Sequence, residues 1–239
     1  MMKNNLSFAD KQMLEYSIMK PYSNISCFST TRHGGCGEGK YATFNCTHYC
    51  GDNSECVKVN LEHVKAFLKN AKANQGKRED VLIIPRQTHT TNVRVVANCP
   101  SEDDLQDVDA VVTHLKGYCL CVSTADCVPI LMYDPVRQVV AAVHAGWRGT
   151  AQDIGGKTVA AMVSAFGPEA EAHIRPSGNK FYVNLKAINA LALRRAGVDC
   201  IEISEDCTMC SPHRYWSHRV TRGIRGSQGA IIICKEGEM

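Results

Sequence analysis

The fold is decided by the stretch VPILMYDPVRQVVAAVH at residues 128–144. Its two apolar halves, VPILMY (128–133) and QVVAAVH (138–144), are separated by the turn dipeptide Asp134-Pro135. Apolar runs of strand length joined by a turn signal predict two buried β-strands paired as an antiparallel hairpin. Such a hairpin brings the start of its first strand beside the end of its second strand.

The segments on both sides of this hairpin alternate between strand-like and helix-like patterns. Short connections and hairpin turns outnumber strand-helix-strand units, which favours a mixed α/β (α+β) fold, with layered mixed β-sheets flanked by helices, over a doubly wound sheet. Without repeats or a linker, residues 1–239 are expected to form a single domain. The expected strands are VLIIP (81–85) and NVRVVA (92–97) around the polar segment RQTHTT, DAVVT (109–113) and YCLCVS (118–123) as another pair, and the late strands IEIS (201–204) and AIIIC (230–234). Three helices are expected: residues 54–70, a segment that carries Val159, Met162, Val163 and Phe166 and ends at Gly167-Pro168, and residues 188–196.

Composition restricts the class of protein. The 27 basic and 24 acidic residues are spread along the chain, which gives no reason to expect a nucleic acid or an anionic membrane as partner. The N-terminus has no apolar stretch of secretory length, and no run approaches a membrane span, so we expect a soluble, cytoplasmic protein. Thirteen cysteines are then expected to be reduced thiols, with Cys119, Cys121 and Cys234 packed in apolar strands.

The candidate reacting centre lies at the mouth of the predicted hairpin. Cys127 directly precedes the first strand and His144 ends the second, so their side chains are expected to meet. A thiolate and an imidazole in this position can be a nucleophile and its base, as in a cysteine hydrolase or amidase, or two ligands of a borderline-soft ion such as zinc. His89, on the polar turn between two strands, is the natural third ligand, and three protein ligands leave the open position that catalytic zinc sites require.

Other motifs carry weaker signals. Cys207-Thr-Met-Cys210 is a single C-x-x-C without a second pair, and we interpret it as structural or incidental. Cys46, His48 and Cys50 alternate along one extended segment, which is not in itself a coordination geometry. The glycine-rich loop TTRHGGCGEGKY (30–41) could bind an anion, but it lacks the P-loop pattern.

Several of these motifs together resemble the YfiH-like family, which is also labelled multicopper polyphenol oxidase or laccase-domain protein. The similarity covers nearly the whole chain from about Ser29 onward, and its most specific part is the block from TADC to HAGWRG. The matching segments are TTRHGG, FNCTHYCGD, Q-T-H, TADCVPILMYDP, VAAVHAGWRGT, YWSHR and QGAIII.

The resemblance implies two layers of sheet flanked by helices and a mononuclear zinc held by His89, Cys127 and His144. It also implies phosphorolysis of adenosine, inosine, guanosine and methylthioadenosine, and deamination of adenosine. A copper-dependent polyphenol oxidase is the alternative suggested by the older label, but nine scattered histidines do not suit several coppers. Substrate-binding roles for phosphate and nucleoside fall on the motif residues Arg32, Asn45, Arg148 and Arg219.

Two positions depart from the family pattern. The segment HIRPSGNKFYVNL has Arg175 where the family has glycine, and the stretch after Pro176 is a few tens of residues shorter than in the family pattern. Val220 follows Arg219 where the family has a second arginine. Because both departures concern the substrate side, a non-catalytic metal or nucleoside binder is a further alternative.

Overall fold

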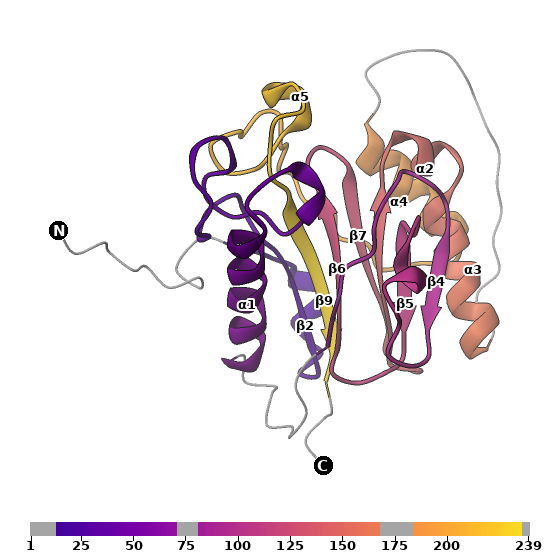
Figure 1. The fold of residues 1–239 in the computed structure, drawn as a ribbon. Helices are drawn as coiled ribbons and strands as arrows, with labels where there is room; N and C mark the ends of the chain where they lie inside the picture. The colour runs from indigo at the N-terminus through magenta and orange to yellow at the C-terminus, as the bar shows by residue number, and fades with distance from the viewer. Residues whose placement is uncertain (1–12, 71–80, 168–183, 236–239) are drawn as a thin grey trace.

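The computed structural model describes residues 13–70, 81–167 and 184–235, and their strands form two sheets (Figure 1). Each sheet contains one parallel strand pair, β3 with β6 and β4 with β5, and is otherwise antiparallel. The first sheet has the order β1 (Leu14–Glu15), β2 (Ile25–Ser29), β9 (Gln228–Cys234), β6 (Tyr118–Thr124) and β3 (Val81–Ile83); the second has the order β4 (Val93–Val96), β5 (Ala110–Thr113), β8 (Val139–Ala145) and β7 (Val128–Asp134).

The two sheets pack face to face around one apolar core. Leu120 and Ile232 of the first sheet share this core with Val111, Val140 and Ala142 of the second. Because successive side chains of a strand point to opposite faces, the neighbouring residues face outward from the pair of sheets. Strands covered on both faces are apolar throughout, as β8 and β9 are.

Helices cover both outer faces (Figure 1). On the first sheet, Cys119 and Cys121 pack against Leu68 of α1 (Ser54–Asn70). On the second sheet, Ala141 packs with Ile154 of α3 (Ile154–Phe166) and with residues of α4 (Leu185–Arg195). The prediction of layered mixed sheets flanked by helices is therefore confirmed, as is the burial of Cys119, Cys121 and Cys234.

The hairpin that decides the fold forms as predicted. Strands β7 and β8 pair antiparallel, with Val128 opposite Ala145 and Pro129 opposite His144. Cys127, one residue before β7, is thereby placed at the same end of the sheet as His144. This register carries the two residues to a common site.

The helix ends follow local capping chemistry. The side chain of Asn53 accepts hydrogen bonds from the backbone of Glu55 at the start of α1, and Asn184 caps α4 in the same way, so that α4 begins three residues before its predicted start. The remaining helical segments are α2 (Trp147–Ala151), α5 (His218–Thr221) and the 3-10 turns η2 (Ser17–Met19), η3 (Gly39–Tyr41), η4 (His48–Cys50) and η5 (Asp103–Leu105). No helix in the described ranges is long and apolar enough to cross a membrane.

Two sequence predictions about strands need correction. The predicted strands at 81–85 and 92–97 form, but β3 and β4 lie in different sheets, and the same is true of β5 and β6. IEIS (201–204) forms no strand, and this prediction is wrong. The carboxylate of Glu202 in this segment accepts a hydrogen bond from the hydroxyl of Ser17 and another from the backbone N–H of Ile18. The segment is thus held by side-chain contacts in place of the backbone hydrogen bonds of a sheet.

Candidate metal centre

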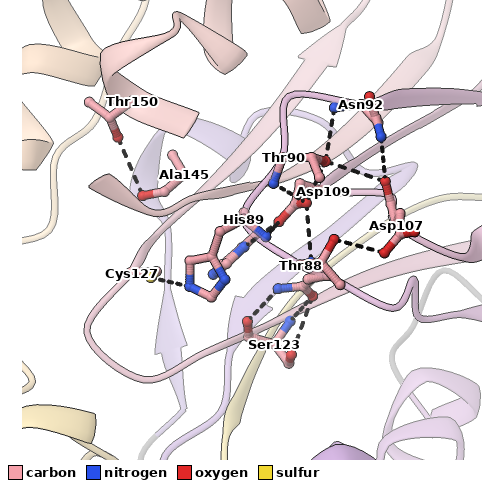
Figure 2. Close-up of polar contacts among 12 residues, drawn as sticks. Thr88, His89, Thr90, Asn92, Asp107, Asp109, Ser123, Cys127, Ala145 and Thr150 are labelled. Atoms are coloured by element: carbon pink, nitrogen blue, oxygen red, sulfur yellow. Dashed lines mark hydrogen bonds and ion pairs between the residues drawn. The ribbon is translucent and has the colours of Figure 1, made fainter. Parts of the chain in front are cut away.

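Two connections and the end of strand β8 bring His89, Cys127 and His144 together at the end of the second sheet. Figure 2 shows the contact between His89 and Cys127. His89 lies between β3 and β4, Cys127 between β6 and β7, and His144 near the end of β8. One ligand atom from each residue lies within 4.8 Å of the others, and Cys127 Sγ is 3.7 Å from His89 Nε2. His144 is buried, Cys127 is half-buried and His89 is exposed, so the cluster has one side open to solvent.

Asp109, the residue before β5, organises this cluster through its carboxylate (Figure 2). Its fully buried carboxylate accepts a hydrogen bond from His144 Nδ1 at 2.7 Å and from the backbone N–H of His89 at 3.1 Å. The other carboxylate oxygen accepts from the backbone N–H of Thr88 and from both the backbone and the hydroxyl of Thr90. Asp109 thus fixes the His144 ring and the backbone turn that carries His89.

His89 also depends on its backbone conformation. Its φ of 64° lies in the left-handed region, which costs energy for a residue with a side chain. The hydrogen bonds from the turn to Asp109 offset this cost. Gln87 anchors the same turn by accepting from and donating to the backbone of Ser123 in β6, at 2.8 Å each.

The cluster shifts the proton affinities of its members. Burial raises the pKa of the Cys127 thiol, but hydrogen bonds from His144 and His89 outweigh burial and lower the pKa from 9.0 to about 6. Burial lowers the pKa of His144, but Asp109 and Cys127 outweigh it and raise the pKa to about 9. Burial raises the pKa of Asp109, but hydrogen bonds from His144 and Thr90 outweigh burial and bring the pKa below its ordinary value of 3.8. The carboxylate is therefore ionised.

The residues present fit a metal ion. Two imidazoles and one thiolate are ligands that zinc and copper accept, and Asp109 orients His144 as carboxylates orient metal-bound histidines. Gly146 keeps the space beside the ligands clear, because a Cβ atom there would lie 2.8 Å from His89 Cδ2 and 3.2 Å from Cys127 Sγ. In the described residues this is the one group of three or more His, Cys, Asp or Glu side chains with ligand atoms this close together.

Cys127 also lines a large cavity of about 800 Å³ that runs along β7 and α4. Arg219 and Gln228 line the same cavity. The backbone N–H of Arg219 donates to Asp126 Oδ2 at 2.8 Å, which ties α5 to the residue next to Cys127. A pocket of this size is large enough for a nucleoside-sized ligand.

The four predicted substrate-binding residues occupy different environments. Arg219 is exposed at the cavity beside Cys127, and Arg148 is exposed in α2, which follows the His144 strand directly. The guanidinium of Arg32 stacks on Trp216 at 3.9 Å and donates to the backbone oxygens of Pro212 and Ala42. The structure thus brings Arg219 to the cavity that Cys127 lines.

Asn45 is fully buried and its amide is used within the protein. It donates to the backbone oxygen of Thr47 and to Asp52, and it accepts from the backbone of Thr47 and Ser227. These contacts join the loop after residue 44 to the start of β9. The departure at Arg175 and the segment after Pro176 lie outside the described residues.

Asp109 is the functional residue that sequence reasoning missed. The sequence places it as the first residue of DAVVT, where an acidic side chain directly precedes a fully apolar strand. Buried carboxylates need hydrogen-bond donors or ions, so this position was the available signal. Nothing in the local sequence indicates that the donors come from residues 88–90 and from His144.

A comparison with protein families matches the chain to the family described as multi-copper polyphenol oxidoreductase laccase, in two stretches at residues 26–175 and 168–235. The crystal structure of YlmD from Geobacillus stearothermophilus superposes with a TM-score of 0.74 at 26% identity, covering 90% of this chain and 94% of that one. The structure of YfiH from Bacillus licheniformis, at 23% identity, shares the fold with a TM-score of 0.78 over 98% of this chain and all of that one.

Among characterised relatives, a purine nucleoside phosphorylase of Bacteroides thetaiotaomicron is 44% identical over 169 residues, which are 68% of this chain and 60% of that protein. The match thus spans less than two thirds of that relative. An adenosine deaminase named RL5, from an unknown prokaryotic organism, is 32% identical over 87% of this chain and 93% of its own length. The chain therefore belongs to the multi-copper polyphenol oxidoreductase laccase family, the YfiH-like family that its motifs resemble.

Proposed function

We propose that this chain is a zinc-dependent purine nucleoside phosphorylase acting on adenosine, inosine, guanosine and methylthioadenosine, with adenosine deamination as a side activity. The observation that carries the proposal is the His89, Cys127 and His144 cluster held by Asp109. The substrate class is supported by the names of the relatives, which are purine nucleoside phosphorylases and one adenosine deaminase. We also propose that residues 1–239 form one catalytic domain located in the cytoplasm, a compartment in which the thirteen cysteines would stay reduced.

In this proposal His89, Cys127 and His144 hold the ion and the side facing solvent is left for substrate. Zinc suits two imidazoles and a thiolate better than it suits an all-oxygen site, and when bound it would supply Lewis-acid stabilisation of developing charge. With the ion bound, Asp109 would accept the Nδ1 proton of His144 and leave the Nε2 lone pair free to ligate. Copper is the alternative suggested by the family description, and metal analysis separates the two.

The chemical step that the protein must support is displacement at the sugar. A phosphate oxygen attacks the anomeric carbon, the bond from that carbon to the purine nitrogen breaks, and the purine leaves with the electron pair and takes up a proton. Arg219, at the cavity beside Cys127, is proposed to bind the phosphate, with Arg148 as a second cation. Arg32 and Asn45 stay proposed as substrate-side residues. Their side chains donate to the backbone oxygens of Pro212 and Thr47, which supports a role in holding the loops on the substrate side in place.

We expect purine release from adenosine, inosine, guanosine and methylthioadenosine to depend on inorganic phosphate, with ribose 1-phosphate or its methylthio analogue as the second product. Chromatography of the products separates phosphorolysis from hydrolysis and from deamination, which would convert adenosine to inosine. Base release at an equal rate without phosphate would contradict phosphorolysis.

The matched variants for this assay are Arg219→Gln and Arg222→Gln. Both arginines are exposed and three residues apart, but of these two only Arg219 lines the cavity with Cys127. Losing one charge-assisted contact to phosphate, worth about 1.5 to 3 kcal/mol, should raise the KM for phosphate roughly tenfold or more in Arg219→Gln. Arg222→Gln should leave it near the wild-type value.

A cysteine hydrolase is the second candidate, because one observation favours it. The pKa of Cys127 near 6 and that of His144 near 9 describe a thiolate beside an imidazolium, which is the ionisation of an activated cysteine nucleophile. The same ionised thiolate is what a metal ligand requires. Chelation and alkylation of Cys127, described below, distinguish the two.

A further inference from the structure

Three pairs of cysteines lie in mutual contact in the described chain, and they differ in access and in ionisation. Cys46 and Cys121 are buried, and a hydrogen bond from Cys121 together with burial raises the pKa of Cys46 well above 9. Cys36 and Cys56 contact each other's backbone oxygens at 3.3 and 3.5 Å, and burial followed by contact with Cys56 raises the pKa of Cys36 to about 11. Cys36 and Cys46 are therefore poor sources of thiolate.

The third pair, Cys207 and Cys210, is exposed on one turn of backbone. The backbone N–H of Ser211 donates to the oxygen of Cys207 at 3.0 Å, which closes a single helical turn around the two cysteines. A separation of three residues on such a turn brings the two Cα atoms to about 5 to 6 Å, within the range that a disulfide spans. The turn therefore needs little rearrangement to form a bond between the two sulfur atoms.

The surroundings of Cys207 favour its thiolate. Lys186 donates to the backbone oxygens of Ser204 at 2.6 Å and Asp206 at 3.2 Å, which fixes an ammonium group close to the turn. The carboxylate of Asp206 is occupied by the hydroxyl of Tyr215 at 2.6 Å. Hydrogen bonds from the thiol and the backbone of Cys210 lower the pKa of Cys207, and Lys186 adds to the effect. An exposed thiol of lowered pKa with a second thiol beside it has the features of a redox-active cysteine.

The turn that carries the pair is also tied to the residue next to Cys127. Cys207 lines the cavity that Cys127 lines, and the hydroxyl of Thr208 donates to Asp126 at 2.7 Å. Asp126 also accepts from the backbone of Arg219, so the turn, α5 and the loop before β7 form one hydrogen-bonded unit. The sequence interpretation of this C-x-x-C as structural does not account for this position.

We propose that Cys207 and Cys210 form a redox-active dithiol that exchanges with small-molecule disulfides of the glutathione class at the wall of the Cys127 cavity. The thiolate of Cys207 attacks one sulfur of the small disulfide, forming a mixed disulfide and releasing one thiolate. Cys210 loses its proton and attacks the sulfur of Cys207, which forms the intramolecular disulfide and releases the second small thiolate. Two protein thiols are oxidised and one small disulfide is reduced to two thiols.

The test uses the full chain with oxidised glutathione and peptide mass mapping after blocking the remaining thiols. In the wild type, the peptide containing residues 207–210 should lose two hydrogens and carry no glutathione. Cys210→Ser should trap one glutathione on Cys207, because the second attack is missing. Cys207→Ser should react at this peptide about tenfold more slowly or not at all, because the more acidic thiol is gone.

The exposed Cys99 provides the matched control, since Cys99→Ser should leave the product at residues 207–210 unchanged. Circular dichroism of each variant verifies that it is folded. Oxidation that goes to Cys36 and Cys56 with residues 207–210 still reduced would overturn the proposal. If Cys207→Ser instead attached glutathione to Cys210 as fast as the wild-type peptide is oxidised, the proposal would also be overturned. The readout is a thiol mass, which needs neither metal nor nucleoside and is independent of the proposed phosphorylase activity.

Discussion

Replacing Cys127 with alanine is expected to remove bound metal and activity together. Three protein ligands hold the proposed ion, and removing one leaves two imidazoles, which is too few for a stable open site. Moderate added zinc should not restore full turnover for the same reason. If Cys127 is instead a nucleophile, the variant should keep any metal and lose activity alone.

Alkylation of Cys127 in the wild type tests the same assignment without a mutation. A ligated thiolate is protected, so a chelator should speed the labelling of Cys127 by a thiol-directed reagent. Cys99, which is exposed and is not one of the proposed ligands, should be labelled at one rate with and without chelator. Equal labelling of Cys127 under both conditions, with no metal in the untreated protein, would favour the cysteine hydrolase.

Replacing Asp109 with asparagine is expected to weaken metal affinity or activity roughly ten- to a hundredfold, although Asp109 contacts no ligand atom that faces the ion. Both carboxylate oxygens accept hydrogen bonds, so an amide group would place donors against the donors of His144 and His89 or of Thr88 and Thr90. Loss of this buried charge should also lower the free energy of unfolding by roughly 3 to 5 kcal/mol.

Metal titration and denaturant unfolding measure the two effects of Asp109→Asn separately. Asp107→Asn is the matched control, because Asp107 is exposed and its carboxylate accepts from the hydroxyl of Thr88 on the same turn. We expect that variant to bind metal nearly as the wild type does. Wild-type metal affinity in folded Asp109→Asn would show that the carboxylate does not position the ligands.

The part of the site predicted from sequence is the part set by one local element. The hairpin of residues 128–144 fixes its own register, so the proximity of Cys127 and His144 follows from the turn alone. The helix at 54–70 was predicted to the residue, because its Asn53 cap and its apolar spacing are both local signals.

The part that sequence did not predict depends on contacts between distant segments. Asp109 acquires its role from residues 88–90 and from β8, which no local pattern links to it. The strands at 81–85 and 92–97 have correct patterns, but the turn carrying His89 crosses from one sheet to the other, and sheet membership is decided by partners elsewhere in the chain. IEIS has the apolar alternation of a strand and lacks a partner strand in the described structure.

Elemental analysis of the purified chain tests the central claim most directly. The account predicts close to one zinc per chain in the wild type, little in Cys127→Ala, and loss of nucleoside cleavage in proportion to the zinc removed by a chelator. Several coppers per chain without zinc, or full activity in metal-free protein, would contradict the assignment of His89, Cys127 and His144 as a catalytic zinc site.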